Sequence, residues 1–103
     1  LNTRGYVPGI PSDFAVEVPA LCGRQGIQPI ATDALPKPLL ARALRERVAP
    51  VELELEAYRT HRKELLVDLV MTDPRSHSLA QAQGLVEQIL SLEANRDMRE
   101  WYR

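Results

Sequence analysis

Apolar residues recur at helical spacing through most of the chain after Leu39, and this pattern predicts a largely helical fold. The first stripe consists of residues three or four positions apart: Leu39, Leu40, Ala43, Leu44, Arg47 and Val48. Pro36 and Pro38 suit the first turn of this helix, where the missing N–H would have had no partner anyway. Pro50 is expected to kink the helix or to begin a new one, because proline cannot donate to the helical hydrogen-bond ladder.

The run Val51–Ala57 alternates between apolar residues and glutamate, a period of two that taken alone favours a strand. Glutamate, leucine and alanine are strong helix formers, and Val51, Leu55 and Tyr58 would share one face of a helix. We therefore predict a helix here.

Two more helices are predicted beyond this run. One should cover His61–Met71 and end at Thr72-Asp73-Pro74, because a residue before proline avoids helical geometry. Ser78 and Gln81 have the spacing of a capping box, which predicts the start of a last helix with an apolar stripe reaching Ala94. Connections are short, so neighbouring helices should pack antiparallel.

The first 38 residues have a different character, with six of the eight prolines and four of the five glycines. Such a segment is expected to be turn-rich, with short strands at Tyr6–Pro8, Ala15–Val18 and Ile27–Ile30. It would need a partner sheet or helices to cover its apolar side chains, Val16, Val18, Leu21 and Ile27. The fold class predicted for residues 1–103 is therefore α+β and mostly helical, with short N-terminal strands (1–38) followed by about four helices (39–103).

Composition narrows the possible functions. The chain has 103 residues and a net charge of −1, which gives no electrostatic case for nucleic acid or an anionic membrane as partner. Its apolar runs are shorter than the ~20 residues of a membrane span, and no signal peptide is recognisable. We expect a cytoplasmic protein. The first residue is not methionine and falls inside the most patterned stretch, so we interpret the chain as a fragment.

Candidate metal ligands and nucleophiles are few. Cys22, His61 and His77 lie far apart and form no paired motif, although a catalytic pair of Cys22 with one histidine stays open. The simpler interpretations are a small buried Cys22, a surface His61 at a helix end, and His77 in the loop before the last helix.

The remaining polar candidates have structural interpretations. We expect the glutamates Glu52, Glu54, Glu56 and Glu64 to form a solvated helix face rather than a two-carboxylate site. Glu17 is expected to form a structural salt bridge, and Gly23–Gly26 lacks the strand–loop–helix context of a phosphate site. Trp101 and Tyr102 are expected to clamp the last helix, with sugar stacking as the alternative. Arg4 and Tyr6 are weak candidates for a substrate-facing role, against a turn-stabilising one.

The N-terminal segment Asn2–Pro19 also carries a resemblance to a known family. Ile10-Pro11-Ser12-Asp13 and Val16-Glu17-Val18-Pro19 resemble the turn and strand in the C-terminal part of family-4 glycoside hydrolases. The similarity continues through Gly26–Pro29, Leu35-Pro36, the glutamate-rich run, Asp73-Pro74 and the final helix. One departure is visible, because Thr3 stands where the family has asparagine and Asn2 lies one place earlier.

The resemblance implies a parent enzyme that is an NAD- and manganese-dependent α-galactosidase, α-glucosidase or 6-phospho-glycosidase. Such enzymes transiently oxidise the C3 hydroxyl of the sugar, remove the C2 proton and break the glycosidic bond by elimination. The NAD-binding domain and the metal-binding Cys and His of the family would lie upstream. No catalytic, NAD-binding or manganese-binding residue is therefore assigned here, and none of these ligands is expected to bind this fragment alone.

By the same resemblance, the chain is a fragment of a second domain like that of lactate dehydrogenase. It would act as scaffold and oligomer interface, with the upstream part of the enzyme and a second copy as partners and a sugar as the parent's substrate. One alternative is a non-enzymatic helical interaction module. Another is an oxidoreductase of the lactate/malate dehydrogenase superfamily, which the Val-Glu-Val-Pro stretch disfavours.

Overall fold

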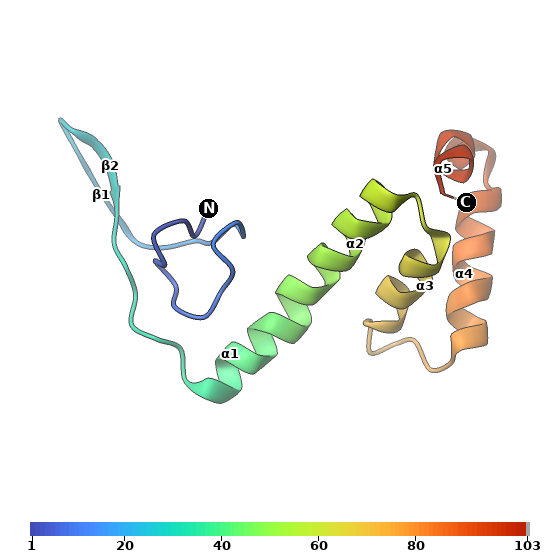
Figure 1. Cartoon of the computed structure of the whole chain (residues 1–103), viewed down its shortest axis with the longest axis horizontal. Coiled ribbons are helices and arrows are strands. Elements are labelled where there is room, and N and C mark those ends of the chain that lie inside the picture. The colour runs from blue at the N-terminus through green and yellow to red at the C-terminus, as the bar shows by residue number, and fades with distance from the viewer. Residues whose placement is uncertain (103) are drawn as a thin grey trace. The chain divides into compact units, whose positions relative to one another are not determined.

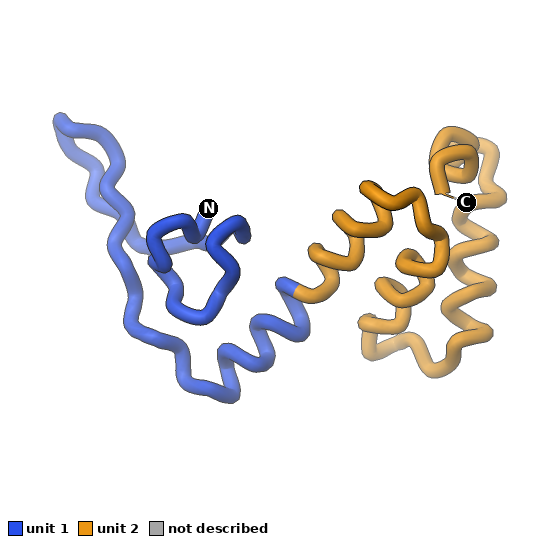
Figure 2. Tube along the Cα trace, in the orientation of Figure 1, with its two compact units in different colours: residues 1–48 blue, residues 49–103 orange. Residues whose placement is uncertain are grey.

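The computed structural model describes residues 1–102 and divides into two compact units, an N-terminal unit of residues 1–48 and a helical unit that begins at Ala49 (Figures 1 and 2). The N-terminal unit contains the strands β1 (Ala20–Gly23) and β2 (Gly26–Pro29), the helix α1 (Lys37–Ala43) and a π-helical turn, η1 (Leu44–Val48). The helical unit contains α2 (Ala49–Thr60), α3 (Lys63–Met71), α4 (Leu79–Ser91), the 3-10 turn η2 (Glu93–Asn95) and α5 (Arg96–Trp101). The α+β class predicted from the sequence is confirmed.

The strands form an antiparallel hairpin with the register Ala20↔Pro29 to Gly23↔Gly26. Gly26 has φ 99°, which supplies the left-handed residue that returns the chain into the second strand. The prediction of a strand at Ile27–Ile30 is confirmed within one residue. A further hydrogen bond from the Ile30 N–H to the Pro19 carbonyl (2.8 Å) extends the pairing.

The strands predicted at Tyr6–Pro8 and Ala15–Val18 were wrong, since both segments are irregular. A strand needs a neighbour for its N–H and C=O groups, and neither segment pairs with another strand among the described residues. β1 was missed because Ala20–Gly23 contains no β-branched residue and no clear alternation.

Pro50 was expected to kink the helix or to begin a new one, and the second outcome is found: α2 begins at Ala49, with Pro50 in its first turn. Pro36 lies at the N-cap of α1 and Pro38 in its first turn, as predicted. Pro50 has no N–H to continue the ladder, and the backbone widens into η1 in the turn just before it. The prediction of a helix over Val51–Ala57 is confirmed by α2.

The core of the helical unit is built from small and branched side chains of α2 and α4. Ala57 and Ala82 are fully buried, and Val86 and Leu90 are 4% exposed. α3 packs against both α2 and α4. Small side chains at the contact let helix axes approach closely, so this modest core still excludes water.

Helix boundaries follow local capping. Ser78 accepts a hydrogen bond from the Gln81 N–H (3.1 Å), while the Gln81 side chain accepts one from the His77 N–H (3.0 Å), which confirms the predicted cap. The last helix was predicted to reach Ala94 but ends at Ser91. The Asn95 amide donates to the Ile89 carbonyl (2.9 Å), so a side chain takes the place of the next helical N–H.

α3 begins at Lys63 and not at the predicted His61, because His61 adopts φ 60° and ends α2. No helix among residues 1–102 is long and apolar enough to cross a membrane.

Candidate functional site

The turn that holds Arg4 and Tyr6 is built around the side chain of Asn2. Asn2 is 1% exposed. Its amide nitrogen donates to the carbonyls of Val7 (3.0 Å) and Ile10 (2.8 Å), and its oxygen accepts from the Val7 N–H (2.9 Å). One side chain therefore satisfies three backbone groups that no strand or helix pairs. The sequence comparison noted only that Asn2 lies one place before the family's asparagine, and it did not predict this role.

Arg4 is exposed and Tyr6 is half-buried at the surface of this turn. The Tyr6 carbonyl accepts two hydrogen bonds from Thr32, one from its N–H (2.8 Å) and one from its hydroxyl (3.0 Å). The backbone of Tyr6 thus ties the turn to the segment after the hairpin. A substrate-facing role for the Arg4 and Tyr6 side chains stays a prediction.

Gly9 lets the same turn pack against α1. A Cβ atom at Gly9 would lie 2.6 Å from the Leu40 Cδ2 atom, and Gly9 has φ 88°. Both the space and the backbone conformation therefore favour glycine.

Cys22 was predicted to be buried, and this was wrong. The thiol belongs to an exposed strand of the hairpin, and Cys22 lines an open hollow together with neighbouring residues of the hairpin and its turn. Every residue of β1 and β2 is exposed, including Leu21 (63%) and Ile27 (74%). Among the described residues, neither face of the two-stranded hairpin is therefore covered by another element. The Gly23–Gly26 stretch forms the hairpin turn.

His61 and Trp101 belong to an aromatic cluster in the helical unit. The ring centroid of Trp101 lies 5.3 Å from Tyr58 and 4.0 Å from His61. The indole N–H donates to the Tyr58 carbonyl (3.2 Å). Burial raises the pKa of Tyr102, and the nearby Glu54 carboxylate raises it further. The predicted clamp of the last residues onto the helical body is confirmed.

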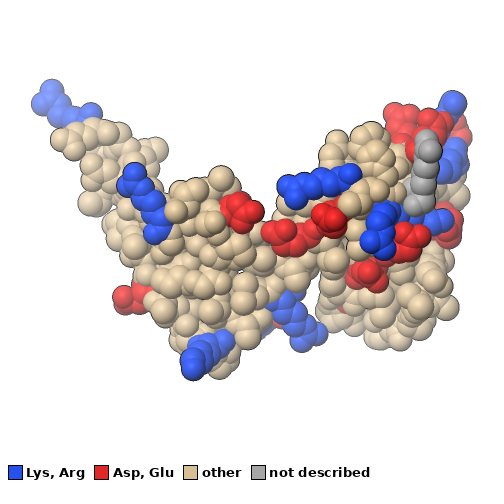
Figure 3. Space-filling view, viewed as in Figure 1, with Lys and Arg blue, Asp and Glu red and all other residues tan. Residues whose placement is uncertain are grey.

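The charged side chains carry mostly structural contacts. The glutamates of the predicted solvated face are exposed: Glu52, Glu54, Glu56 and Glu64. Glu17 is also exposed and forms no ion pair among residues 1–102, so the salt bridge predicted for it is absent there. On the face in view, basic and acidic side chains are interspersed over the helical unit (Figure 3).

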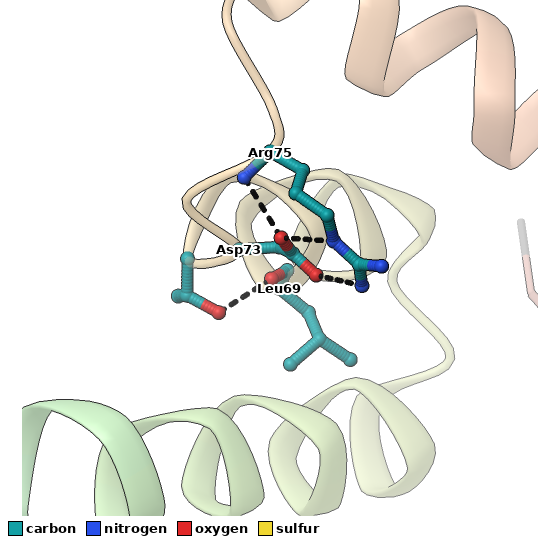
Figure 4. A network of polar contacts seen from close by, with 4 residues as sticks. Leu69, Asp73 and Arg75 are labelled. Atoms are coloured by element: carbon teal, nitrogen blue, oxygen red, sulfur yellow. Dashed lines mark hydrogen bonds and ion pairs between the residues drawn. The ribbon is translucent and has the colours of Figure 1, made fainter.

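Asp73 and Arg75 form a polar cluster at the turn after α3 (Figure 4). The Arg75 side chain donates to both Asp73 oxygens (3.0 and 2.7 Å), and the Arg75 N–H adds a third bond (2.8 Å). These contacts lower the pKa of Asp73 to about 2. Thr72 caps α3 by donating to the Leu69 carbonyl (2.7 Å). The cluster closes a turn, and its second ionisable group, Arg75, stays protonated because Asp73 raises its pKa further, so the pair is a structural contact.

The donor atoms do not fit a bound metal. Among residues 1–102, no group of three or more His, Cys, Asp or Glu side chains converges at a position that could hold an ion. The His61 ring packs on Trp101, His77 lies exposed before α4, and Cys22 lies in the other unit. We therefore derive no chemical step through manganese or NAD from these residues.

Comparison with known families identifies a match over most of the chain. The model of the family 4 glycosyl hydrolase C-terminal domain matches residues 1–76, which include the Asn2 turn, the hairpin, α1, α2, α3 and the Asp73–Arg75 turn. The match covers about three quarters of the chain and agrees with the resemblance carried by Ile10–Asp13 and Val16–Pro19. The chain therefore belongs to the family of family 4 glycosyl hydrolase C-terminal domains.

Proposed function

We propose that this chain is the C-terminal portion of an NAD- and manganese-dependent glycosidase that acts on α-linked, plain or phosphorylated sugars. The observation that carries the proposal is the family match over residues 1–76. In such an enzyme NAD supplies a reversible oxidation of the sugar, and the residues that hold NAD and the metal belong to other parts of the protein. This chain contributes scaffold and subunit contacts in the cytoplasmic parent enzyme.

The hairpin supports the scaffold role. Side chains alternate along each strand and cross-strand partners share a face, so Cys22 and Ile27 lie on the same side as Ala20 and Pro29. That face is entirely apolar and exposed. An isolated hairpin is marginally stable in water, so this face is suited to packing against a further layer of the parent domain.

The outer side of α4 supports the role in subunit contacts. Leu85 is 43% exposed and Ile89 is 39% exposed, one turn apart on the same helix face. Their polar neighbours on this side are Gln81 and Gln88, which carry no charge. The only charged residue of α4, Glu87, pairs instead with Lys63 (2.7 Å). Two copies can therefore meet along this face without like-charge repulsion.

The decisive experiment uses the complete reading frame that contains this chain. The expressed protein should hydrolyse nitrophenyl α-glycosides or their 6-phosphates only when NAD and Mn²⁺ are both supplied. The 103-residue chain alone should neither bind NAD nor turn over these substrates. A complete protein that lacks a nucleotide-binding domain, or a chain that binds NAD alone, would contradict the proposal.

The alternative is a helical interaction module without enzymatic activity, which the exposed apolar residues of α2 and α4 favour. The same reading frame separates the two functions. A glycine-rich strand–helix start together with metal-binding Cys and His residues selects the enzyme, whereas a start codon directly before Leu1 selects the module.

A further inference from the structure

The side chain of His61 lies where α5 is fastened to the end of α2. Its ring centroid is 4.0 Å from that of Trp101, with 35° between the two ring planes. Tyr58 stacks on the same indole, and the indole N–H donates to the Tyr58 carbonyl (3.2 Å). That carbonyl is among the last four of α2, which lack the helical partner that earlier carbonyls have. Trp101 therefore caps the helix that His61 ends.

The backbone of His61 places its ring beside the end of the helix. His61 has φ 60°, in the left-handed region, where histidine is one of the few residue types that are enriched besides glycine. A left-handed residue of this kind closes the last turn of a helix, next to carbonyl oxygens that carry the negative end of the helix dipole. A positive charge is favoured at this point. Histidine is also the side chain that ordinarily changes charge between about pH 5 and pH 8.

We propose that His61 makes the docking of α5 sensitive to pH: its protonated ring holds Trp101 against the end of α2, and loss of the proton loosens α5. A cation over the face of a tryptophan, within about 6 Å of the ring centroid, is attracted by the π-system of the ring. The neutral imidazole loses this attraction together with the attraction to the helix end. The contribution is therefore fully present at pH values below the titration of His61, and it is lost as pH rises through that titration.

The contact joins two parts of the chain with different standing in the family match. Tyr58 and His61 lie within the matched residues 1–76, whereas Trp101 lies beyond them. The proposal therefore does not rest on the glycosidase activity, and it concerns a segment that the match does not describe.

The other charged groups around this contact have both signs. Several are paired with one another: Arg62 with Glu64 (3.8 Å), Lys63 with Glu87 (2.7 Å) and Arg96 with Glu100 (3.3 Å). The remaining charged residues on the end of α2, on η2 and on α5 are all exposed: Glu54, Glu56, Arg59, Glu93, Asp97 and Arg99. The pKa of the Tyr102 hydroxyl is raised, chiefly by burial, so this group stays protonated between pH 5 and pH 8. Salt screens exposed charges that are not in contact, so a measurement at about 0.5 M salt isolates the contact between the rings.

The exposure of the contact limits the size of the effect. Trp101 is 39% exposed and His61 is exposed, so water competes for the charge. A cation on an exposed tryptophan then changes the opening equilibrium of α5 by about two- to fivefold. The buried residues Ala57, Ala82 and Val86 do not take part in the contact, so the helical unit should stay folded at both ends of the pH range.

The test follows Trp101 in the full chain, because it is the sole tryptophan and its indole N–H gives a separate NMR signal. Exchange of this N–H with solvent is measured from about pH 5.5 to pH 8 and divided by the exchange rate of free indole at each pH. We expect protection to fall about two- to fivefold as pH rises. The midpoint should agree with the titration of the His61 ring signals, and the change should persist at about 0.5 M salt.

Variants at the two histidines assign the effect. His61→Asn keeps a residue that tolerates the left-handed region but cannot ionise, so protection should be low and independent of pH. His61→Arg keeps a cation that stacks on an indole, so protection should be independent of pH and higher than in His61→Asn. His77→Asn is the matched control, because His77 lies in the loop before α4 and this variant should titrate like the unchanged chain. Circular dichroism checks that the helices are intact in each variant.

Four results would overturn the proposal. The first is protection of the indole N–H that does not change, or that rises, between pH 5.5 and pH 8. The second is the same pH dependence in His61→Asn as in the unchanged chain. The third is a pH dependence that His77→Asn abolishes. The fourth is a His61→Arg variant whose protection still falls with pH, since a permanent cation should remove the dependence.

Discussion

Asn2 holds the N-terminal turn together with one side chain, so its removal should be costly. Asn2→Ala leaves the Val7 N–H and the Ile10 carbonyl without their partner at partly buried positions, and the Val7 carbonyl keeps only the longer bond from the Ile10 N–H (3.4 Å). We expect a loss of about 2–4 kcal/mol in the stability of the N-terminal unit. The measurement is amide hydrogen exchange at Val7, whose protection should fall accordingly.

Two further variants test whether the effect comes from the Asn2 amide. Asn2→Asp keeps an oxygen that accepts from the Val7 N–H but cannot donate to the two carbonyls, so it should also be destabilised. Thr3→Ala changes an exposed side chain and should have little effect. Equal protection at Val7 in Asn2→Ala and Thr3→Ala would show that the amide does not organise the turn.

The Asp73–Arg75 cluster predicts a specific pH dependence. The pKa of Asp73 is lowered to about 2 from 3.8, chiefly by the hydrogen bond from the Arg75 side chain. A lowered pKa in the folded state stabilises the fold above the unfolded pKa, and this contribution is lost as pH falls from about 4 towards 2. NMR titration of the Asp73 carboxyl should show the low pKa, and Arg75→Ala should raise it towards its ordinary value. An unchanged titration in Arg75→Ala would contradict this account.

Single residues also show where sequence reasoning reached its limit. The Ser78–Gln81 cap and the helix-end position of His61 were predictable, because both depend on neighbours within a few positions. The exposure of Cys22 and the burial of Asn2 were not, since each depends on how the N-terminal segment folds back on itself. Cysteine is usually buried and asparagine is usually exposed. In the N-terminal unit the opposite holds for Cys22 and Asn2.

Among the elements, α2 shows how two patterns can compete. The alternation of Val51–Ala57 has the period of a strand, but its residue types favour a helix, and the helix forms. In the helix, this alternation places Val51, Leu55 and Tyr58 on a second apolar face. The predicted strands failed for the opposite reason, because a strand such as Ala15–Val18 needs a pairing partner that no local pattern can supply.

The hairpin offers a matched pair of glycine substitutions. Gly26 and Gly23 are cross-strand partners with open space around both, but only Gly26 has a positive φ, 99°. Gly26→Ala should therefore destabilise the hairpin by about 1 kcal/mol, and Gly23→Ala should be tolerated. Cross-strand NMR contacts between Cys22 and Ile27 provide the measurement. Equal loss of these contacts in both variants would show that the turn conformation is not the cause.

At the scale of the whole molecule, the family match and the structural unit do not end together. The match stops at residue 76, whereas the buried residues Ala82, Val86 and Leu90 belong to α4. Trp101 then stacks on Tyr58 and His61, which closes α5 onto the end of α2. Residues beyond the match are therefore part of the same helical core, although nothing in the match itself indicates it.

The two compact units each have their own stabilising contacts, and this predicts that they respond separately to mutation. Trp101→Ala should remove the aromatic clamp and destabilise the helical unit by about 1–3 kcal/mol, while exchange at Val7 stays unchanged. Met98→Ala, at an exposed position in the same helix, should have a smaller effect. Conversely, Asn2→Ala should lower protection at Val7 and leave the fluorescence of Trp101 unaltered.

Independent sites give additive changes, so the double variant Asn2→Ala/Trp101→Ala should show the sum of the two effects within about 0.5 kcal/mol. A larger deviation, or loss of protection in both units from either single change, would mean that the chain unfolds as one cooperative body.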